Sequence, residues 1–146
     1  SLHDALPISK AILAGEPIKV FNHGQMKRDF TYIGDIVSGV VAALDRCPTS
    51  DDGFDRILAA SSESWAPYRV FNIGNSEPEE LMTFIGELEL ALGVSAKKDF
   101  QPMQLGDVVA TYADASKLEE WTGFCPTTSI QEGVNHFVDW YRSYFN

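Results

Sequence analysis

The chain has 146 residues, of which 45% are hydrophobic and 22% are charged. This length suits one domain that buries enough surface to form a core without disulfide bonds, so a disulfide-dependent miniprotein is excluded. The net charge of −10 repels phosphate backbones and anionic lipids, and the longest apolar stretch, residues 36–44, is shorter than the about 20 residues that cross a bilayer. We therefore expect neither a nucleic-acid partner nor a membrane partner.

The cysteines and histidines indicate no metal site. Cys47 and Cys125 lie far apart in no spacing typical of metal ligands, and we expect both to be reduced thiols, as in a cytoplasmic protein. His23 lies in a predicted turn and His136 lies within a predicted helix, so we expect no chemical role for either.

The first nine residues differ from the rest of the chain. They contain no initiator Met and lack the basic start and apolar middle of a secretory signal. Their first eight residues match, in order, the translation of the end of a common sequencing adapter in one reading frame. We therefore expect residues 1–9 to be non-native, the native chain to begin near Lys10, and further protein to be missing upstream.

Residues 10–33 predict the end of a helix and two short strands. Gly15 follows the helical segment 10–14 and is typical of helix C-termini. The segments 18–21 and 28–33 are rich in residues that favour strands and are separated by a turn.

The next segment predicts a helix, a loop and a strand. Asp35 precedes a helical apolar spacing over 36–46, which predicts a helix that Asp35 caps and whose apolar face is buried. Residues 47–67 are rich in Ser, Asp, Gly and Pro and predict a surface loop. Residues 68–74 predict a strand.

Three further helices are predicted towards the C-terminus. A Ser-x-x-Glu capping box at Ser76 predicts a helix that ends at Gly93, and a second box at Ser129 predicts a helix that runs to the end of the chain. Between them, the segment 97–107 is expected to end in a turn, and residues 114–121 are expected to form a short helix.

The order of these elements is β, β, α, β, α, loop, α, α, which indicates an α/β fold. Three short strands form a thin sheet, and the apolar strand at 68–74 requires partners on both sides. The sequence therefore predicts an incomplete sheet, in agreement with missing residues upstream.

Two small groups of residues are candidates for a binding site, although no motif of a self-sufficient active site occurs. Lys27 and Arg28 form a basic pair, and the planar guanidinium of Arg28 suits a phosphate group. Gln104 and Asp107 flank Gly106, where an amide, a carboxylate and an accessible backbone suit the hydroxyl groups of a ribose. The alternatives are a solvated surface pair and an ordinary turn in which Asp107 accepts neighbouring N–H groups.

Four segments of the chain, in order, resemble the C-terminal part of the extended short-chain dehydrogenases/reductases. Within that family they are most similar to NAD-dependent nucleotide-sugar epimerases, and specifically to UDP-glucuronate 4-epimerases. The resemblance runs from Lys10 to the C-terminus and is carried by residues 15–21, 28–36, 68–74 and 103–114.

The resemblance implies a role in substrate binding for five residues. Ile18 and Val20 would line a uracil slot, Arg28 would bind the diphosphate, and Asp107 would hold the ribose hydroxyl groups. Gln104 stands where galactose-type epimerases carry an Arg, which favours a uronic acid substrate. The family's catalytic Ser/Thr and Tyr-x-x-x-Lys, and the Gly-rich loop of its N-terminal NAD-binding Rossmann domain, do not occur here, so we expect no catalytic, cofactor-binding or metal-binding residues in this chain.

The implied function is that of a fragment, inactive alone, of an enzyme that interconverts UDP-glucuronate and UDP-galacturonate by transient oxidation at C4. Residues 10–146 would form the nucleotide-sugar region and add one strand–helix unit to the Rossmann sheet, and the complete enzyme would be a homodimer. The alternatives are a decarboxylase or 4,6-dehydratase of the same family, and a non-catalytic nucleotide-sugar-binding module. A plain interaction domain would require that Arg28 and Asp107 do not converge.

Overall fold

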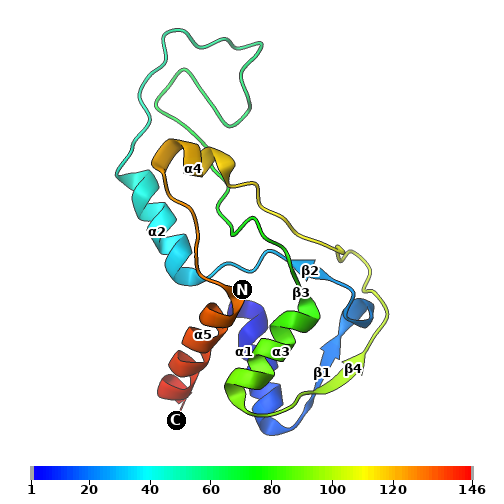
Figure 1. Cartoon of the computed structure of the whole chain (residues 1–146). Helices are drawn as coiled ribbons and strands as arrows, with labels where there is room; N and C mark the ends of the chain where they lie inside the picture. The colour runs from blue at the N-terminus through cyan, green and yellow to red at the C-terminus, as the bar shows by residue number, and fades with distance from the viewer. Residues whose placement is uncertain (1, 146) are drawn as a thin grey trace.

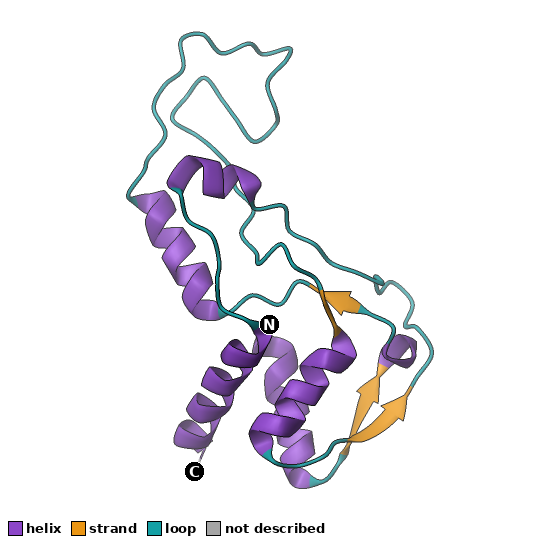
Figure 2. Cartoon of the chain, viewed as in Figure 1, coloured by secondary structure: helices purple, strands orange, loops and turns teal. Residues whose placement is uncertain are grey.

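The computed structural model describes the backbone of residues 2–145 and the side chains of residues 5–145. Its lower part in Figure 1 contains the helices and strands α1 (Leu2–Ala14), β1 (Pro17–Val20), α3 (Leu81–Leu92), β4 (Lys97–Phe100) and α5 (Ile130–Phe145). Its upper part contains α2 (Ile33–Leu44), α4 (Ser116–Thr122) and the long connection 45–78. The strands β2 (Lys27–Arg28) and β3 (Glu79–Glu80) lie between these parts, and a 3-10 turn, η1 (Phe21–Gly24), follows β1. Figure 2 shows that helices and loops dominate this α/β fold.

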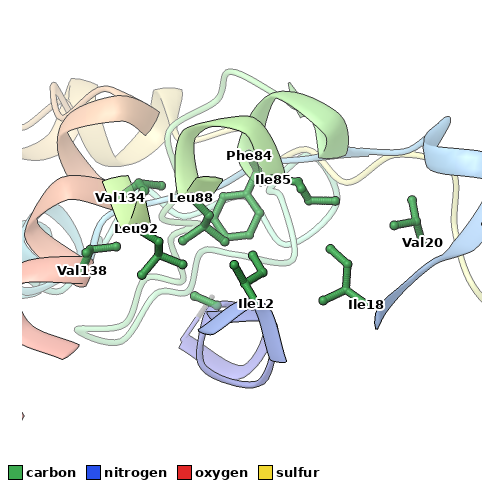
Figure 3. Packing of buried hydrophobic residues seen from close by; sticks show 10 residues of the cluster. Ile12, Ile18, Val20, Phe84, Ile85, Leu88, Leu92, Val134 and Val138 are labelled. Carbon is green, nitrogen blue, oxygen red and sulfur yellow. The ribbon is translucent and has the colours of Figure 1, made fainter. Parts of the chain in front are cut away.

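The hydrophobic core lies in the lower part, where α1, α3 and α5 pack together beside β1 (Figure 3). Leu88 of α3 is fully buried, and Ile12 of α1 and Val138 of α5 belong to the same buried cluster. Each of the helices α3 and α5 buries an apolar face: Phe84, Ile85, Leu88 and Leu92 of α3, and Val134 and Val138 of α5. Gly93 ends α3 in the left-handed conformation, with φ 70°, as the sequence predicts.

The two longer strands pair in parallel, with Pro17 opposite Lys97 and Val20 opposite Phe100. The first strand is confirmed within one residue, but the sequence did not indicate β4. Three of its four residues are polar, and most of the strand is exposed, so it lacks the alternation of a half-buried strand. Glu89 of α3 anchors it, because its carboxylate accepts hydrogen bonds from the Ala96 N–H and from Lys98 Nζ, both at 2.6 Å.

The second predicted strand is much shorter than expected. Only β2 forms, and it pairs antiparallel with β3. The prediction of a strand over 28–33 is wrong because the chain leaves the sheet at Asp29, whose carboxylate accepts N–H groups from two other segments.

The helix predicted over 36–46 begins earlier, at Ile33, and Asp35 is not its cap. Asp35 lies in the first turn, and its carboxylate accepts the Thr128 N–H at 3.1 Å. The prediction of a buried apolar face is also wrong, since Gly39 is the buried residue of α2. Five apolar side chains of α2 are between 48% and 70% exposed: Ile33, Val37, Val40, Val41 and Leu44.

Residues 68–74 do not form the predicted strand. Arg69 makes a single bridge with Glu63, and no neighbouring strand within residues 2–145 pairs with the rest of the segment. A strand requires a partner for its backbone groups, and the described chain does not supply one.

The two capping boxes have different outcomes. Ser76 does not cap a helix, because α3 begins at Leu81, and the Ser76 hydroxyl donates to the Ala113 carbonyl at 2.7 Å instead. Ser129 does act as a cap, since its Oγ accepts the Glu132 N–H at 3.2 Å. The short helix predicted at 114–121 forms as α4, and the loop at 47–67 is confirmed.

The N-terminal helix includes most of the segment expected to be non-native. From Leu2 onwards this segment forms α1 together with residues 10–14, and Ala5 and Ser9 are buried. That residues 1–9 are non-native stays a prediction, which re-sequencing of the source DNA would test. None of the helices within residues 2–145 has the length and apolar character needed to cross a membrane.

Ser9 predicts a stabilising substitution. Its Oγ is buried without a hydrogen-bond partner among the described residues, and such an unpaired hydroxyl costs about 1–3 kcal/mol. Ser9→Ala is therefore expected to raise the free energy of unfolding by about 1 kcal/mol in urea titrations. The control is Ser38→Ala in α2, where the hydroxyl is exposed and only helix propensity changes. An equal gain in both variants would contradict a cost of the buried hydroxyl.

Glu89 predicts a pH dependence of stability. Partial burial acts to raise its pKa, but the hydrogen bonds from Lys98 and Ala96 outweigh burial, and the pKa is lowered from its ordinary value of 4.5. Its contribution to stability is therefore present above that value and is lost as the pH falls through the lowered pKa. Glu89→Gln should destabilise the chain most at pH 7, and the difference from the parent chain should shrink as the solution is acidified.

Urea titrations at pH 7 and below pH 4.5 measure this difference. Glu87→Gln serves as the control, since it removes a carboxylate from the same helix and leaves the Glu89–Lys98 pair intact. A destabilisation by Glu89→Gln that stays constant over this range would contradict the assignment.

Candidate functional site

Arg28 is held at the junction between the two parts of the structure. Its strand β2 pairs with β3 on one side and contacts residues 109–111 on the other. The Lys27 N–H donates to the Val109 carbonyl at 2.8 Å, and the Thr111 N–H donates to the Lys27 carbonyl at 3.2 Å. The segment after the Gln104 turn thus lies along the strand that carries Arg28.

The guanidinium of Arg28 contacts Asp107 and two carbonyl groups of this segment. Nη2 donates to Asp107 Oδ1 at 3.0 Å, and Nη1 donates to the Val108 carbonyl at 2.9 Å and to the Val109 carbonyl at 3.4 Å. The two side chains are 25% and 30% exposed, so the ion pair is accessible from solvent without being fully hydrated. The structure brings together two residues that are 79 positions apart.

Gln104 and Asp107 form the two ends of a tight turn. The Asp107 N–H donates to the Gln104 carbonyl at 3.1 Å, and Gly106 has a φ of 86°, which favours glycine. Asp107 Oδ1 also accepts the Val108 N–H at 2.9 Å. Gln104 is exposed, and the turn places it on the same corner of the molecule as the Arg28–Asp107 pair.

Ile18 and Val20 do not present their side chains at this surface. They are 4% and 1% exposed and belong to the hydrophobic core (Figure 3). Their burial shows that both side chains pack in the core, and a role of β1 in lining a slot for a base stays a prediction.

Asp29 is a residue of the site that the sequence reasoning missed. Its carboxylate accepts the N–H groups of Asn75, Ser76 and Ala113 at 3.1, 3.2 and 2.9 Å. The sequence signal that could have identified Asp29 is its position directly after Arg28 in the segment 28–36. An Asp directly after a short strand has a carboxylate that can accept backbone N–H groups of neighbouring loops, which is the structural role seen here.

A large cavity lies elsewhere in the described part of the chain. It has a volume of about 930 Å³, lies beside α1, α2, α3 and α5, and is lined mainly by apolar and aromatic side chains such as Phe30, Tyr32, Phe84, Phe137 and Trp140. Arg28, Gln104 and Asp107 do not line it. Its lining includes Asp29 and His136 but no Arg or Lys side chain, so the charged corner suits a phosphate group better than this cavity does.

The charged corner has the chemistry of a binding site. A guanidinium offers directed donors for anionic oxygens, and a carboxylate accepts hydrogen bonds from hydroxyl groups. A plain interaction domain, which would require Arg28 and Asp107 to lie apart, is not supported by this geometry.

The sequence model of the GDP-mannose 4,6-dehydratase family matches residues 5–137. The chain belongs to this family. Membership confirms the resemblance to NAD-dependent epimerases and dehydratases on which the sequence analysis relied.

Individual members of the family are similar over nearly the whole chain. An uncharacterized 37.6 kDa protein of Escherichia coli O111:H- is 48% identical over 94% of this chain, and a probable UDP-glucuronate 4-epimerase of Rhizobium meliloti is 43% identical over 90%. A crystal structure of the UDP-glucuronic acid 4-epimerase of Bacillus cereus, in complex with UDP-glucuronic acid and NAD, matches 93% of the chain with 30% identity and a TM-score of 0.71. The chain spans 41%, 39% and 38% of the lengths of these three proteins.

Proposed function

We propose that this chain is the nucleotide-sugar-binding part of an NAD-dependent epimerase that interconverts UDP-glucuronate and UDP-galacturonate. The observation that carries the proposal is the convergence of Arg28 and Asp107 at one partly exposed corner. The similarity to UDP-glucuronate 4-epimerases of Rhizobium meliloti and Bacillus cereus supports the choice of substrate.

In this proposal Arg28 binds the diphosphate and Asp107 binds the ribose hydroxyl groups. The phosphate oxygens would replace some of the acceptors that Arg28 now contacts, namely Asp107 and the carbonyl groups of residues 108 and 109. Asp107 would then be free to accept hydrogen bonds from hydroxyl groups. Gln104, exposed beside them, would contact the ligand through a neutral amide.

NAD would be held by a part of the protein outside these residues. The chain has no Gly-rich loop between a strand and a helix, so its residues do not fit the phosphates of a dinucleotide. Its residues would contribute binding energy and orientation, which place the sugar for a reaction that other residues carry out.

Two features support the proposal that a further domain of the enzyme packs against these residues. The apolar side chains of α2 are exposed, and the segment 68–74 is extended without a partner strand within residues 2–145. We propose that the segment 68–74 adds a strand to the sheet of a Rossmann domain formed by other residues, and that the apolar face of α2 packs against that domain. Dimer formation by the complete protein stays a prediction.

A dehydratase or decarboxylase is the second candidate. The matched family model carries the description of a 4,6-dehydratase, and the residues that distinguish these reactions are not among those assigned above. A non-catalytic binding module would bind the nucleotide sugar at the same Arg28–Asp107 site but would not convert it.

Arg28→Ala is expected to weaken UDP binding to the purified chain by about 1.5–3 kcal/mol, because a charge-assisted hydrogen bond is lost. Isothermal titration calorimetry with UDP measures the change. Lys97→Ala, which removes an exposed charge of the same sign on β4, is the control and should leave the affinity unchanged. Equal affinities of the parent chain and the Arg28→Ala variant would refute the role of Arg28.

A chimera tests the reaction. Residues 10–146 joined to the N-terminal portion of the Rhizobium meliloti relative should convert UDP-glucuronate into UDP-galacturonate in the presence of NAD, whereas the 146-residue chain alone should not. Nucleotide-sugar chromatography identifies the product. Release of CO₂ from UDP-glucuronate would favour the decarboxylase, and formation of a 4-keto-6-deoxy sugar from UDP-glucose, offered in a parallel assay, would favour the dehydratase. A folded chimera without any product would favour the binding module.

A further inference from the structure

Asp29 connects three distant segments of the chain but does not contact Arg28 itself. Its Oδ2 accepts the N–H groups of Ser76 and Ala113, and its Oδ1 accepts that of Asn75. Asp29 directly follows the last residue of β2, and among the described residues no hydrogen bond or ion pair joins its carboxylate to Arg28. Asp29 is thus placed to act through the backbone rather than on a ligand at the charged corner.

The segment 107–113 is fixed to β2 at both of its ends. Arg28 holds the upstream end through Asp107 and the carbonyl groups of residues 108 and 109. Asp29 holds the downstream end, because its own N–H donates to Thr111 Oγ1 at 3.1 Å and its carboxylate accepts the Ala113 N–H at 2.9 Å. Without the Asp29 carboxylate, the Arg28 contacts and the backbone hydrogen bonds of Lys27 to Val109 and Thr111 still hold the segment, but the Ala113 N–H loses its acceptor.

The close approach that this arrangement needs depends on Gly74. A Cβ atom at this position would lie 2.5 Å from the Ala113 Cβ and 3.0 Å from Asp29 Oδ2. The segment 72–76 can therefore reach Asp29 and Ala113 together only with glycine there.

We propose that Asp29 is a positioning residue for ligand binding, which rests on the proposed function of Arg28 and Asp107. Its carboxylate fixes the segment 107–113 along β2, and this keeps the guanidinium and the Asp107 carboxylate in the geometry that receives the diphosphate and the ribose. A binding site whose supporting shell is rigid loses less freedom when the ligand binds.

A double-mutant cycle distinguishes positioning from a purely structural role. Asp29→Asn keeps the size of the side chain but replaces one acceptor oxygen with a donor, so the three N–H groups are no longer all accepted. It should weaken UDP binding about fivefold in the parent chain but by less than about 1.5-fold in the Arg28→Ala background, because the two residues act on one contact. Isothermal titration calorimetry measures the four affinities, and circular dichroism verifies that each variant is folded.

Two further variants keep the test decisive. Thr111→Val removes only the acceptor of the Asp29 N–H and should lower UDP affinity in the same direction if Asp29→Asn fails to fold. Asp35→Asn alters a carboxylate of similar exposure that accepts the Thr128 N–H, and it should leave UDP affinity unchanged.

The outcomes separate this inference from the proposed function. Weaker binding by Arg28→Ala together with an additive cycle, or with unchanged affinity in both Asp29→Asn and Thr111→Val, overturns the positioning role alone. Unchanged affinity in Arg28→Ala overturns the proposed function and this inference with it.

Discussion

The carboxylate of Asp29 is the interaction on which the upper part of the structure depends. The hydrophobic core lies among α1, β1, α3 and α5, and it does not extend to the loops above them. Those loops expose backbone N–H groups that need acceptors, and Asp29 supplies them for two segments at once. Asp35 does the same for Thr128, and the Trp121 indole N–H donates to the Arg46 carbonyl at 2.7 Å. Polar contacts therefore hold the segments of the upper part together, whereas apolar packing holds the lower part together.

The charged corner follows from the same arrangement. In a chain with a net charge of −10, an anionic ligand requires a local positive group that long-range repulsion does not cancel. Arg28 is such a group, and Asp107 together with backbone carbonyl groups holds it in place while no ligand is bound. A ligand that carries both phosphates and hydroxyl groups can offer a new partner to each member of this pair, whereas a simple anion can satisfy only one.

For both α2 and the segment 68–74, the sequence pattern predicts burial or pairing that the described residues do not provide. Members of the family that are similar over nearly the whole chain are more than twice as long as this chain. The spacing of Val37, Val40, Val41 and Leu44 is that of a buried helix face, yet these side chains are exposed here. The pattern predicts the helix, but burial of its apolar face requires a packing partner, which residues 5–145 do not supply.

The sequence by itself determined the α/β class, the end of α3 at Gly93 and the cap at Ser129, and it predicted Arg28, Gln104 and Asp107 as candidate binding residues. These features depend on local conformational preferences or on motifs that residues close in the chain carry. Tertiary structure alone decided that Arg28 and Asp107 meet, that Ile18 and Val20 are buried, that residues 97–100 form an exposed strand, and that Asp29 ends β2 early. Each of these depends on a contact between residues distant in sequence, which local preference does not encode.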